Sequence, residues 1–455
     1  MSVLERHESE PLLIISYDWP PMVAGVRRWV KFAHYLPEFD YRPLVVCARP
    51  TRFGAHDEEP LHGEVSGVSA LMTSSYDPYH AAQQFSRLMG RRGKSAVGAS
   101  VGADDVEAVS GFRSFARRAA RQCLNFCLFP DDRVGWVGPA TRAAAKLIER
   151  HHIRKIVTTS YPHSAHLVGL RLKRKFPDLY WLADFRDGWV QNPYFRNAPT
   201  PLHRYLHRRL EAKVVIKADA VVTVCEPIAR HLSAVACNSK PVHVISNGYD
   251  SRDYASPVGA PFDKLTLVYT GTLFMQRSPD EFFRALSDVV RTVNRVEDRL
   301  QVIFMSKFLP EHYESVHRYG LDNIVRVEPM GSHRAALELQ RRADGLLAIE
   351  GRAAGAEIML TQKIFEYMAA RRPVLAIAPE GALADAVRAS GCGVVVAPED
   401  YEGLCEALRL LLAADGSFPF ELNEAYIAQF DRQFLTRRLA RLLDMNDLYD
   451  YRKEK

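Results

Sequence analysis

Residues 361–377 read Thr361-Gln-Lys-Ile-Phe-Glu-Tyr-Met-Ala-Ala-Arg-Arg-Pro-Val-Leu-Ala-Ile377. Ile364, Phe365 and Met368 recur at helical spacing and can face a core. Pro373 ends the helix because it has no backbone N–H and its ring clashes with the turn before it. The apolar residues that follow form a compact strand. The stretch therefore predicts a short amphipathic helix that leads into a buried strand, which is a unit of an α/β fold.

Lys363 and Glu366 lie three residues apart and share a face near the start of this helix. Amides at a helix start and a lysine can hold phosphate, and a carboxylate can accept hydrogen bonds from ribose hydroxyls. The combination suits a sugar nucleotide. An ordinary ion pair on the helix surface explains the same two residues, so both interpretations stay open at this point.

The length and composition favour a globular protein of two domains. The chain has 455 residues, 47% of them apolar and 25% charged, which is too long for one ordinary core. No apolar run reaches the roughly 18 residues of a membrane span, and the first ten residues are too acidic and polar for a signal peptide. The seven cysteines are scattered and form no zinc motif. We therefore expect a cytoplasmic location and no metal site.

The positive charge is concentrated in the first half of the chain. Residues 1–250 hold 34 Lys and Arg against 24 Asp and Glu, whereas residues 251–455 hold 26 against 30. A basic half can indicate nucleic acid or an anionic membrane surface as partner. The sequence has no zinc finger, RNP aromatic motif or basic zipper, so we expect no nucleic-acid partner.

Two segments of the first half stand apart from the regular pattern. Residues 50–110 are rich in Gly, Ser and acidic residues and predict a long, partly mobile insertion. Phe112 to Phe129 predicts a helix with arginines on one side and aromatic residues nearby. This helix could lie on an anionic membrane, or it could dock on its own domain with its arginines in water.

Strands and helices alternate along the chain in two successive runs. The first run reaches residue 250, and the Pro- and Gly-containing residues 251–261 form a linker to the second. Such alternation predicts a mainly parallel sheet in each run. The expected strands are 11–17, 43–47, 153–159, 179–183, 219–224 and 241–245 in the first run, and 265–270, 300–305, 324–328, 344–349, 374–377 and 392–396 in the second. A last helix is expected at about 424–446.

Polar clusters follow two of the expected strands in the first run. Residues 160–166 contain His163 and His166, and residues 184–189 begin with Asp184. Open α/β sheets bind ligands at the carboxyl ends of their strands. These clusters are therefore candidates for a ligand site, and Asp131 and Asp132 are expected to cap a helix rather than bind a metal.

Seven motifs, taken together and in order, resemble glycosyltransferase family 4, whose members have the GT-B fold. They are residues 14–21, 25–29, 184–187, 223–227, 245–248, 269–273 and 363–374. The resemblance covers nearly the whole chain. A divergent clade with Lys-x-x-Glu-Tyr and Asp-Phe-Arg-Asp motifs matches better than the mainstream of the family.

The resemblance implies two Rossmann-like doubly wound domains that face each other across a cleft. It implies an acceptor-binding domain at 1–250, a nucleotide-sugar-binding domain at 251–423 and a final segment at 424–455 that crosses back to the first domain. It also implies donor-binding roles for seven residues: Gly25, Gly271, Thr272, Arg277, Glu350, Lys363 and Glu366.

The sequence departs from the family at two donor positions. Ile358 stands where a second carboxylate precedes Glu366, and Thr272 stands where an arginine follows the glycine. Glu350 or Glu357 could supply the missing carboxylate. Arg277 occupies the position of a diphosphate-binding lysine, and a solvated arginine is its alternative role.

The resemblance also implies catalytic and acceptor-binding residues. Catalytic candidates are His163, His166 and Glu366, although a histidine at either position can instead be a helix cap or a packed ring. Acceptor-binding candidates are Arg27, Asp184, Arg186 and Asp187. An internal salt-bridge network is the alternative for these four.

We therefore expect a glycosyltransferase that moves a sugar, with retention, from a nucleotide-diphosphate donor to a lipid-linked or polysaccharide acceptor in cell-surface glycan synthesis. No cofactor or essential metal is expected. The enzyme is expected in the cytoplasm. An anionic membrane surface is a candidate partner, which would place it peripherally on the inner face of the membrane. A sugar-nucleotide 2-epimerase of the same fold and a non-catalytic nucleotide-sugar-binding scaffold are the alternatives.

Overall fold

The computed structural model folds into two compact units, which are described separately. It describes residues 9–21, 26–50, 67–76, 128–192, 200–273, 277–292, 298–413 and 421–453, with side chains up to residue 444. The described residues within 1–245 and 436–455 form the first unit, and those within 246–435 form the second. Gly25 and most of the expected helix from Phe112 to Phe129 lie outside the described residues.

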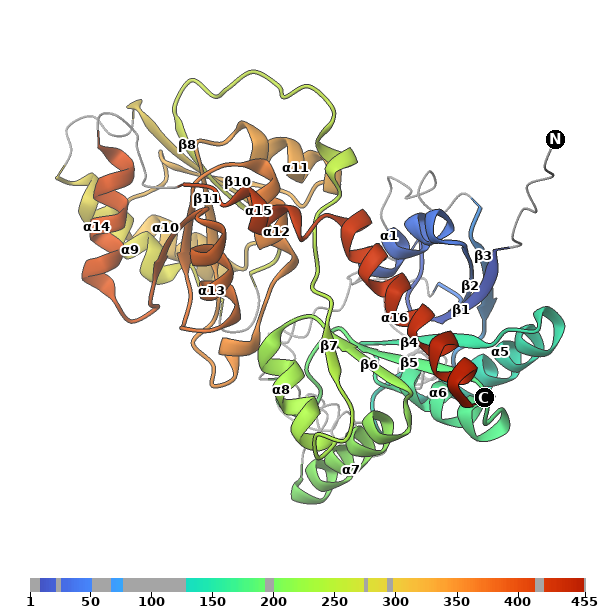
Figure 1. Ribbon diagram of the computed structural model, residues 1–455. Helices are drawn as coiled ribbons and strands as arrows, with labels where there is room; N and C mark the ends of the chain where they lie inside the picture. Colours follow the sequence, from blue (N-terminus) through green and yellow to red (C-terminus); the bar gives the residue numbers. More distant parts are fainter. Residues whose placement is uncertain are drawn as a thin grey trace, which may run out of the picture. The chain divides into compact units, whose positions relative to one another are not determined.

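The first unit is built on a parallel sheet with the strand order β3-β2-β1-β4-β5-β6-β7 in its described part (Figure 1). The strands are β1 (Glu10–Ile15), β2 (Tyr41–Ala48), β3 (Ser69–Thr73), β4 (Lys155–Ser160), β5 (Tyr180–Phe185), β6 (Ala220–Thr223) and β7 (Val242–Val244). The helices are α1 (Arg27–Tyr35), α5 (Val137–His151), α6 (Ser164–Lys175), α7 (Pro201–Lys217) and α8 (Glu226–Val235). The order reverses between β1 and β4, which is the switch point where doubly wound sheets bind ligands.

The second unit repeats this plan with the parallel order β10-β9-β8-β11-β12-β13 and a switch point between β8 and β11. Its strands are β8 (Leu265–Thr270), β9 (Leu300–Met305), β10 (Val325–Glu328), β11 (Gly345–Ile349), β12 (Val374–Ile377) and β13 (Gly393–Val396). Its helices are α9 (Asp280–Val290), α10 (Pro310–Arg318), α11 (His333–Arg342), α12 (Gln362–Ala370), α13 (Ala382–Ser390), α14 (Tyr401–Leu412) and α15 (Glu424–Ala428).

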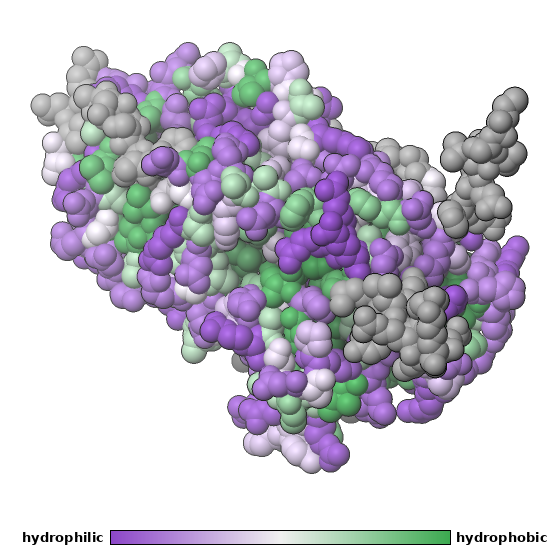
Figure 2. All heavy atoms as spheres, in the orientation of Figure 1, coloured by the Kyte–Doolittle hydropathy of each residue, from purple (hydrophilic) through white to green (hydrophobic). Residues whose placement is uncertain are grey.

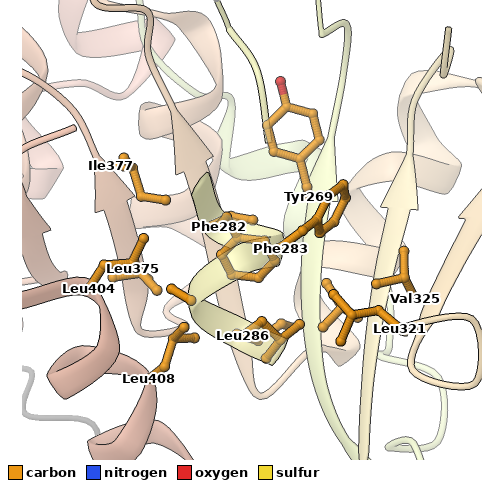
Figure 3. Packing of buried hydrophobic residues seen from close by; sticks show 14 of the residues in the cluster. Tyr269, Phe282, Phe283, Leu286, Leu321, Val325, Leu375, Ile377, Leu404 and Leu408 are labelled. Carbon is orange, nitrogen blue, oxygen red and sulfur yellow. The ribbon is translucent and has the colours of Figure 1, made fainter. Parts of the chain in front are cut away.

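Helices cover both faces of the second sheet. On one face, Phe282 and Phe283 of α9 and Leu408 of α14 pack against alternate strand residues such as Leu375 (Figure 3). On the other face, residues of α11, α12 and α13 pack against the strand residues in between. Because both faces are buried, the strands are continuous apolar runs, which is why the sequence predicts them.

The last helix, α16 (Arg432–Lys453), begins in the second unit and continues into the first. The hydroxyl of Tyr41 donates to Asp444 over 2.6 Å, and that of Tyr180 donates to the carbonyl of Leu442 over 3.2 Å. These bonds attach the C-terminal part of α16 to β2 and β5 of the first unit. None of the described helices is long and apolar enough to span a membrane.

The predicted α/β fold of two parallel-sheet Rossmann-like units is confirmed, and two details differ. β3 lies inside residues 50–110, where the sequence predicts only an insertion. It is an edge strand whose first three residues are exposed, so it lacks the apolar run that marks the other strands. The expected helix at 424–446 is two helices, because Asp431 forms a β-bridge with Tyr249 between α15 and α16.

A buried ion pair joins α1 to the sheet of the first unit. Asp184 at the end of β5 is fully buried and accepts hydrogen bonds from Arg28 (3.1 Å), the Trp29 indole (2.6 Å) and the Thr159 hydroxyl (2.8 Å). Arg28 is also buried, and its guanidinium lies 4.9 Å from the ring centroid of Phe32. These contacts are the internal network that the sequence leaves open as the alternative for Asp184, and its acceptor role stays a prediction.

Replacing Asp184 by asparagine is expected to destabilise the protein by about 3–5 kcal/mol, because it leaves the buried Arg28 charge without its carboxylate. Urea unfolding followed by circular dichroism measures this. Asp187→Asn is the matched control, since that side chain is 38% exposed beside Arg186 and its loss is expected to cost less than about 1 kcal/mol. Equal stability of the two variants would show that the Asp184 network contributes nothing specific.

Candidate active site

The carboxyl edge of the second sheet gathers polar groups from several elements. Gly271 follows β8 and Ser306 follows β9, and the two strands pair so that Thr270 lies opposite Met305. The amide of Gly271 donates to the carbonyl of Met305 over 3.0 Å. Lys363, in the first turn of α12, reaches this edge from the helix start, so amides, hydroxyls and a cation are available to one ligand.

Lys363 is a partly buried cation with no carboxylate of the described residues within 4 Å of its ammonium group. Its ammonium donates to the hydroxyl of Tyr269 over 2.7 Å and lies 4.0 Å from the centroid of that ring. The Tyr269 hydroxyl in turn donates to the carbonyl of Thr272 over 3.1 Å. Tyr269 therefore holds the lysine beside the loop that follows β8.

Burial and the nearby Arg277 lower the pKa of Lys363 from its ordinary value of 10.5 to about 7, although Glu350 and Glu366 partly oppose this. Such a lysine either loses its proton or is stabilised in its charged form by a nearby anion. The Lys363 side chain is therefore a candidate for contact with an anion at the start of α12, and its donor-binding role stays a prediction.

Gly271 is required by this arrangement. Its φ is +107°, a backbone conformation that residues with a side chain rarely adopt, and an added Cβ would lie 2.5 Å from Cε of Lys363. The loop after β8 can thus approach the lysine closely. This fits the donor-binding role that the sequence suggests for Gly271, which stays a prediction, as does that of the exposed Thr272.

Arg277 and Glu350 form a second buried ion pair. The guanidinium donates twice to the carboxylate, over 2.9 and 2.8 Å, and the Glu350 side chain is fully buried. The amide of Gly351 also donates to Glu350 over 3.1 Å. Because Glu350 neutralises Arg277, the pair can orient a ligand through N–H groups but offers less net charge than Lys363. The alternative of a solvated arginine is excluded.

Glu366 points to different partners from Lys363, so the surface ion pair that their spacing allows does not form. The Glu366 carboxylate lies 3.1 Å from Nε2 of His333 and accepts a hydrogen bond from Nε2 of Gln340 over 3.3 Å. Gln340 donates also to the hydroxyl of Thr270 over 2.9 Å. Glu366 is 8% exposed. Its carboxylate is thus held in a fixed orientation at the same edge as Lys363.

Two buried polar atoms of this edge have no hydrogen-bond partner among the described residues. They are the hydroxyl of Ser306, directly after β9, and Oε1 of Gln340. Native proteins seldom leave such atoms unsatisfied, so both are candidates for contact with a polar ligand. Ile358, which stands where the family has a carboxylate, is buried in the short 3₁₀ helix Ala356–Ile358. Its apolar side chain cannot take the role of that carboxylate.

The carboxyl edge of the first sheet carries the histidines. The His163 ring stacks on Trp189 at 4.3 Å with an angle of 1°, and the His166 ring lies 4.6 Å from Phe185. Burial lowers the pKa of His166 to about 3 and that of His163 well below its ordinary value. Both are therefore neutral at pH 7, and Nδ1 of His166 lies 2.8 Å from the hydroxyl of Thr158. Packed rings explain this geometry, and a catalytic role stays a prediction.

The other acceptor-binding candidates lie nearer to solvent. Arg186 donates to Asp187 over 3.2 Å and to the carbonyl of Tyr161 over 3.5 Å. Arg27 is partly exposed at the start of α1. The carboxyl of Asp18, after β1, has its pKa raised to about 6 by burial, although Arg186 and Arg133 oppose this.

Sequence reasoning missed several of these residues. His333, Gln340 and Ser306 belong to no recognised motif, and only the position of Ser306 directly after a strand could have drawn attention to it. Tyr269 lies in the motif at 269–273, but nothing in the sequence indicates that it binds Lys363. Asp131 is a cap, as expected, but it caps α6: its carboxylate accepts from the amide (2.8 Å) and hydroxyl (2.6 Å) of Ser164.

Lys363→Met is expected to stabilise the ligand-free protein, raising Tm by about 3 °C at pH 7. The folded pKa of about 7 lies below the ordinary 10.5, so folding disfavours the lysine charge. This destabilisation is complete below pH 7 and is lost as pH rises from 7 to 10.5. The gain in Tm from the substitution should shrink over the same range.

Thermal unfolding at several pH values measures this effect. Lys307→Met, at an exposed lysine of the same edge, serves as the control and should change Tm little. A Lys363→Met protein that is less stable than the parent at pH 7 would contradict the assignment of Lys363 as an unbalanced cation.

Comparisons with known proteins agree with this architecture. Residues 103–253 match the family model described as Glycosyltransferase Family 4. The search of curated proteins found no match. The structure is similar to sucrose-phosphate synthase from Thermosynechococcus elongatus, with 13% identity, a TM-score of 0.64, and 97% of this chain and 100% of that chain covered.

Two further solved structures share the fold. Anabaena HepE in complex with UDP has 12% identity and a TM-score of 0.63, with 96% of this chain and 100% of that chain covered. A glycosyltransferase from Rickettsia africae ESF-5 has 13% identity and a TM-score of 0.58, with 96% and 99% covered. Structural similarity at 12–13% identity shows only that the fold is shared. The match to the family model is a similarity of sequence, over residues 103–253. The chain has the two-unit GT-B architecture of these structures, and its residues 103–253 are similar to Glycosyltransferase Family 4.

Proposed function

We propose that the chain transfers a sugar from a nucleotide-diphosphate sugar to a lipid-linked or polysaccharide acceptor in cell-surface glycan synthesis. The observation that carries the donor part is Lys363, a partly buried cation with no carboxylate of the described chain within 4 Å. A diphosphate supplies the missing negative charge. When the glycosidic bond breaks, more charge develops on the leaving diphosphate, and a cation fixed beside it lowers the barrier.

The surroundings of Lys363 suit the rest of such a donor. Glu366 is a carboxylate oriented by His333 and Gln340, and it can accept hydrogen bonds from ribose hydroxyls. Gly271 lets the loop after β8 approach the phosphates closely. The titles of the Anabaena HepE structures name UDP and UDP-glucose as its ligands. We extend only the ligand class, a nucleotide sugar, to this chain.

The remaining parts of the proposal rest on the family relationship. We infer retention of configuration and the absence of an essential metal from the resemblance to the family. The same resemblance proposes His163 and His166 at the reacting sugar, and Arg27, Arg186 and Asp187 at the acceptor. The excess of basic residues in residues 1–250 supports an anionic or lipid-linked acceptor at a membrane. The five described cysteines are free thiols, which supports a cytoplasmic site of action.

Isothermal titration calorimetry against a panel of nucleotide-diphosphate sugars tests the donor assignment. Glu366→Gln is expected to weaken binding of the preferred donor by about tenfold, because one charge-assisted hydrogen bond to the ribose is lost. Glu399→Gln, at an exposed carboxylate of the same unit, is the control and should bind like the parent. Unchanged affinity in Glu366→Gln would show that the ribose role is wrong, and no binding by the parent would refute the donor class.

A further inference from the structure

The outer face of α7 exposes large apolar side chains to solvent. Leu202 is 59% exposed, Tyr205 52%, Leu206 39% and Ile216 53%. A helix on the surface of a globular protein ordinarily turns such residues inward and its charges outward. The outer face of α7, defined here by Leu202, Tyr205, Leu206 and Ile216 with the cations between them, reverses this pattern.

The inner face of the helix explains why it cannot rotate to bury these residues. His203, His207 and Glu211 are buried instead. The indole of Trp189 donates to Nδ1 of His207 over 3.1 Å, and Nε2 of His231 lies 2.9 Å from the Glu211 carboxylate. These polar contacts fix the orientation of α7, so the apolar residues are held outward by the fold.

The charged residues of the outer face all have one sign. Arg209 and Lys213 lie between the apolar residues, Arg208 and Lys217 are exposed at the sides of the face, and Glu211, the only carboxylate of the helix, is buried. The guanidinium of Arg209 lies 5.7 Å from the ring centroid of Tyr205 and donates to its hydroxyl over 3.0 Å. Figure 2 shows hydrophilic and hydrophobic residues intermixed over the lower part of the view, where Figure 1 draws α7.

The first turns of α7 lie toward the edge of the first sheet that carries the candidate acceptor residues. Only Ala218 and Asp219 separate the end of α7 from the start of β6, so α7 runs antiparallel to the strands. Its first turns, with Leu202, Tyr205 and Leu206, therefore lie toward the carboxyl edge of the first sheet. That edge carries the candidate acceptor residues.

We propose that the outer face of α7 lies on an anionic lipid bilayer. Exposed cations attract anionic headgroups, while leucine, isoleucine and tyrosine side chains insert at the level of the acyl boundary. Nucleic acid would use the cations but has no use for the aliphatic side chains. This inference rests on the proposed function, because it explains how the enzyme would reach a lipid-linked acceptor.

Sedimentation of the full chain with sucrose-loaded vesicles tests the proposal. Binding is expected to vesicles of phosphatidylglycerol and phosphatidylcholine, and to be much weaker to phosphatidylcholine alone. Each cation at an anionic surface strengthens binding by about fivefold, so Arg208→Gln with Arg209→Gln should weaken it by about 25-fold. Leu202→Ser with Leu206→Ser should weaken it by about tenfold.

Matched controls separate this face from general effects. Arg142→Gln with Lys146→Gln removes two exposed cations of α5, and Tyr313→Ser with Leu410→Ser removes two exposed apolar residues of the second unit. Both controls should bind vesicles within about twofold of the parent. Circular dichroism verifies that every variant is folded, and donor binding by calorimetry should be unchanged in all of them.

The outcomes distinguish this proposal from the proposed function. Vesicle binding that the α7 variants and the controls share equally would overturn the assignment of α7, as would binding of the parent to a duplex DNA probe but not to anionic vesicles. Absence of donor binding in the parent would refute the proposed function instead. Loss of vesicle binding with intact donor binding in the α7 variants is the result that we expect.

Discussion

The placement of Lys363, with no carboxylate of the described residues within 4 Å of its ammonium group, is the constraint around which the polar groups at the carboxyl edge of the second sheet are arranged. Tyr269 holds the ammonium from the sheet, the hydroxyl of that tyrosine bonds the loop after β8, and Gly271 is the residue that leaves room for the lysine. Around it, Glu350 already compensates the charge of Arg277. Among the described residues the charge of Arg277 is thus compensated and that of Lys363 is not, which is the basis for proposing an anionic ligand there.

The two units use buried ion pairs for the same physical purpose. In the first, Asp184 joins β5 to Arg28 and Trp29 of α1; in the second, Glu350 at the end of β11 holds Arg277. Each pair lies at the carboxyl edge of a parallel sheet, where the strand ends leave backbone groups for a ligand. Such pairs add little net stability compared with apolar packing, but they fix where the neighbouring loops lie. We regard both as positioning elements.

The sequence predicts the fold well because its strands are buried on both faces and appear as apolar runs, such as those of β8, β9 and β12. It misses β3, since an edge strand with an exposed face has no such run. The site is predictable only in part. Local spacing places Lys363 and Glu366 on one helix, but their actual partners, Tyr269 from β8 and Gln340 from α11, come from distant elements. For Asp184 the sequence leaves both an acceptor role and an internal salt bridge open, and the structure shows the internal bonds to Arg28 and Trp29.

The central claim is that the ammonium group of Lys363 binds an anion, the diphosphate of the donor. Its ε-amine can be titrated directly by NMR with isotope-labelled lysine, with assignment through the loss of its signal in Lys363→Met, in the free protein and with saturating pyrophosphate. The account predicts a pKa near 7 in the free protein and a rise of about one unit or more when the anion is bound. A lysine that titrates near 10.5 in the free protein, with no change on addition of pyrophosphate, would contradict it.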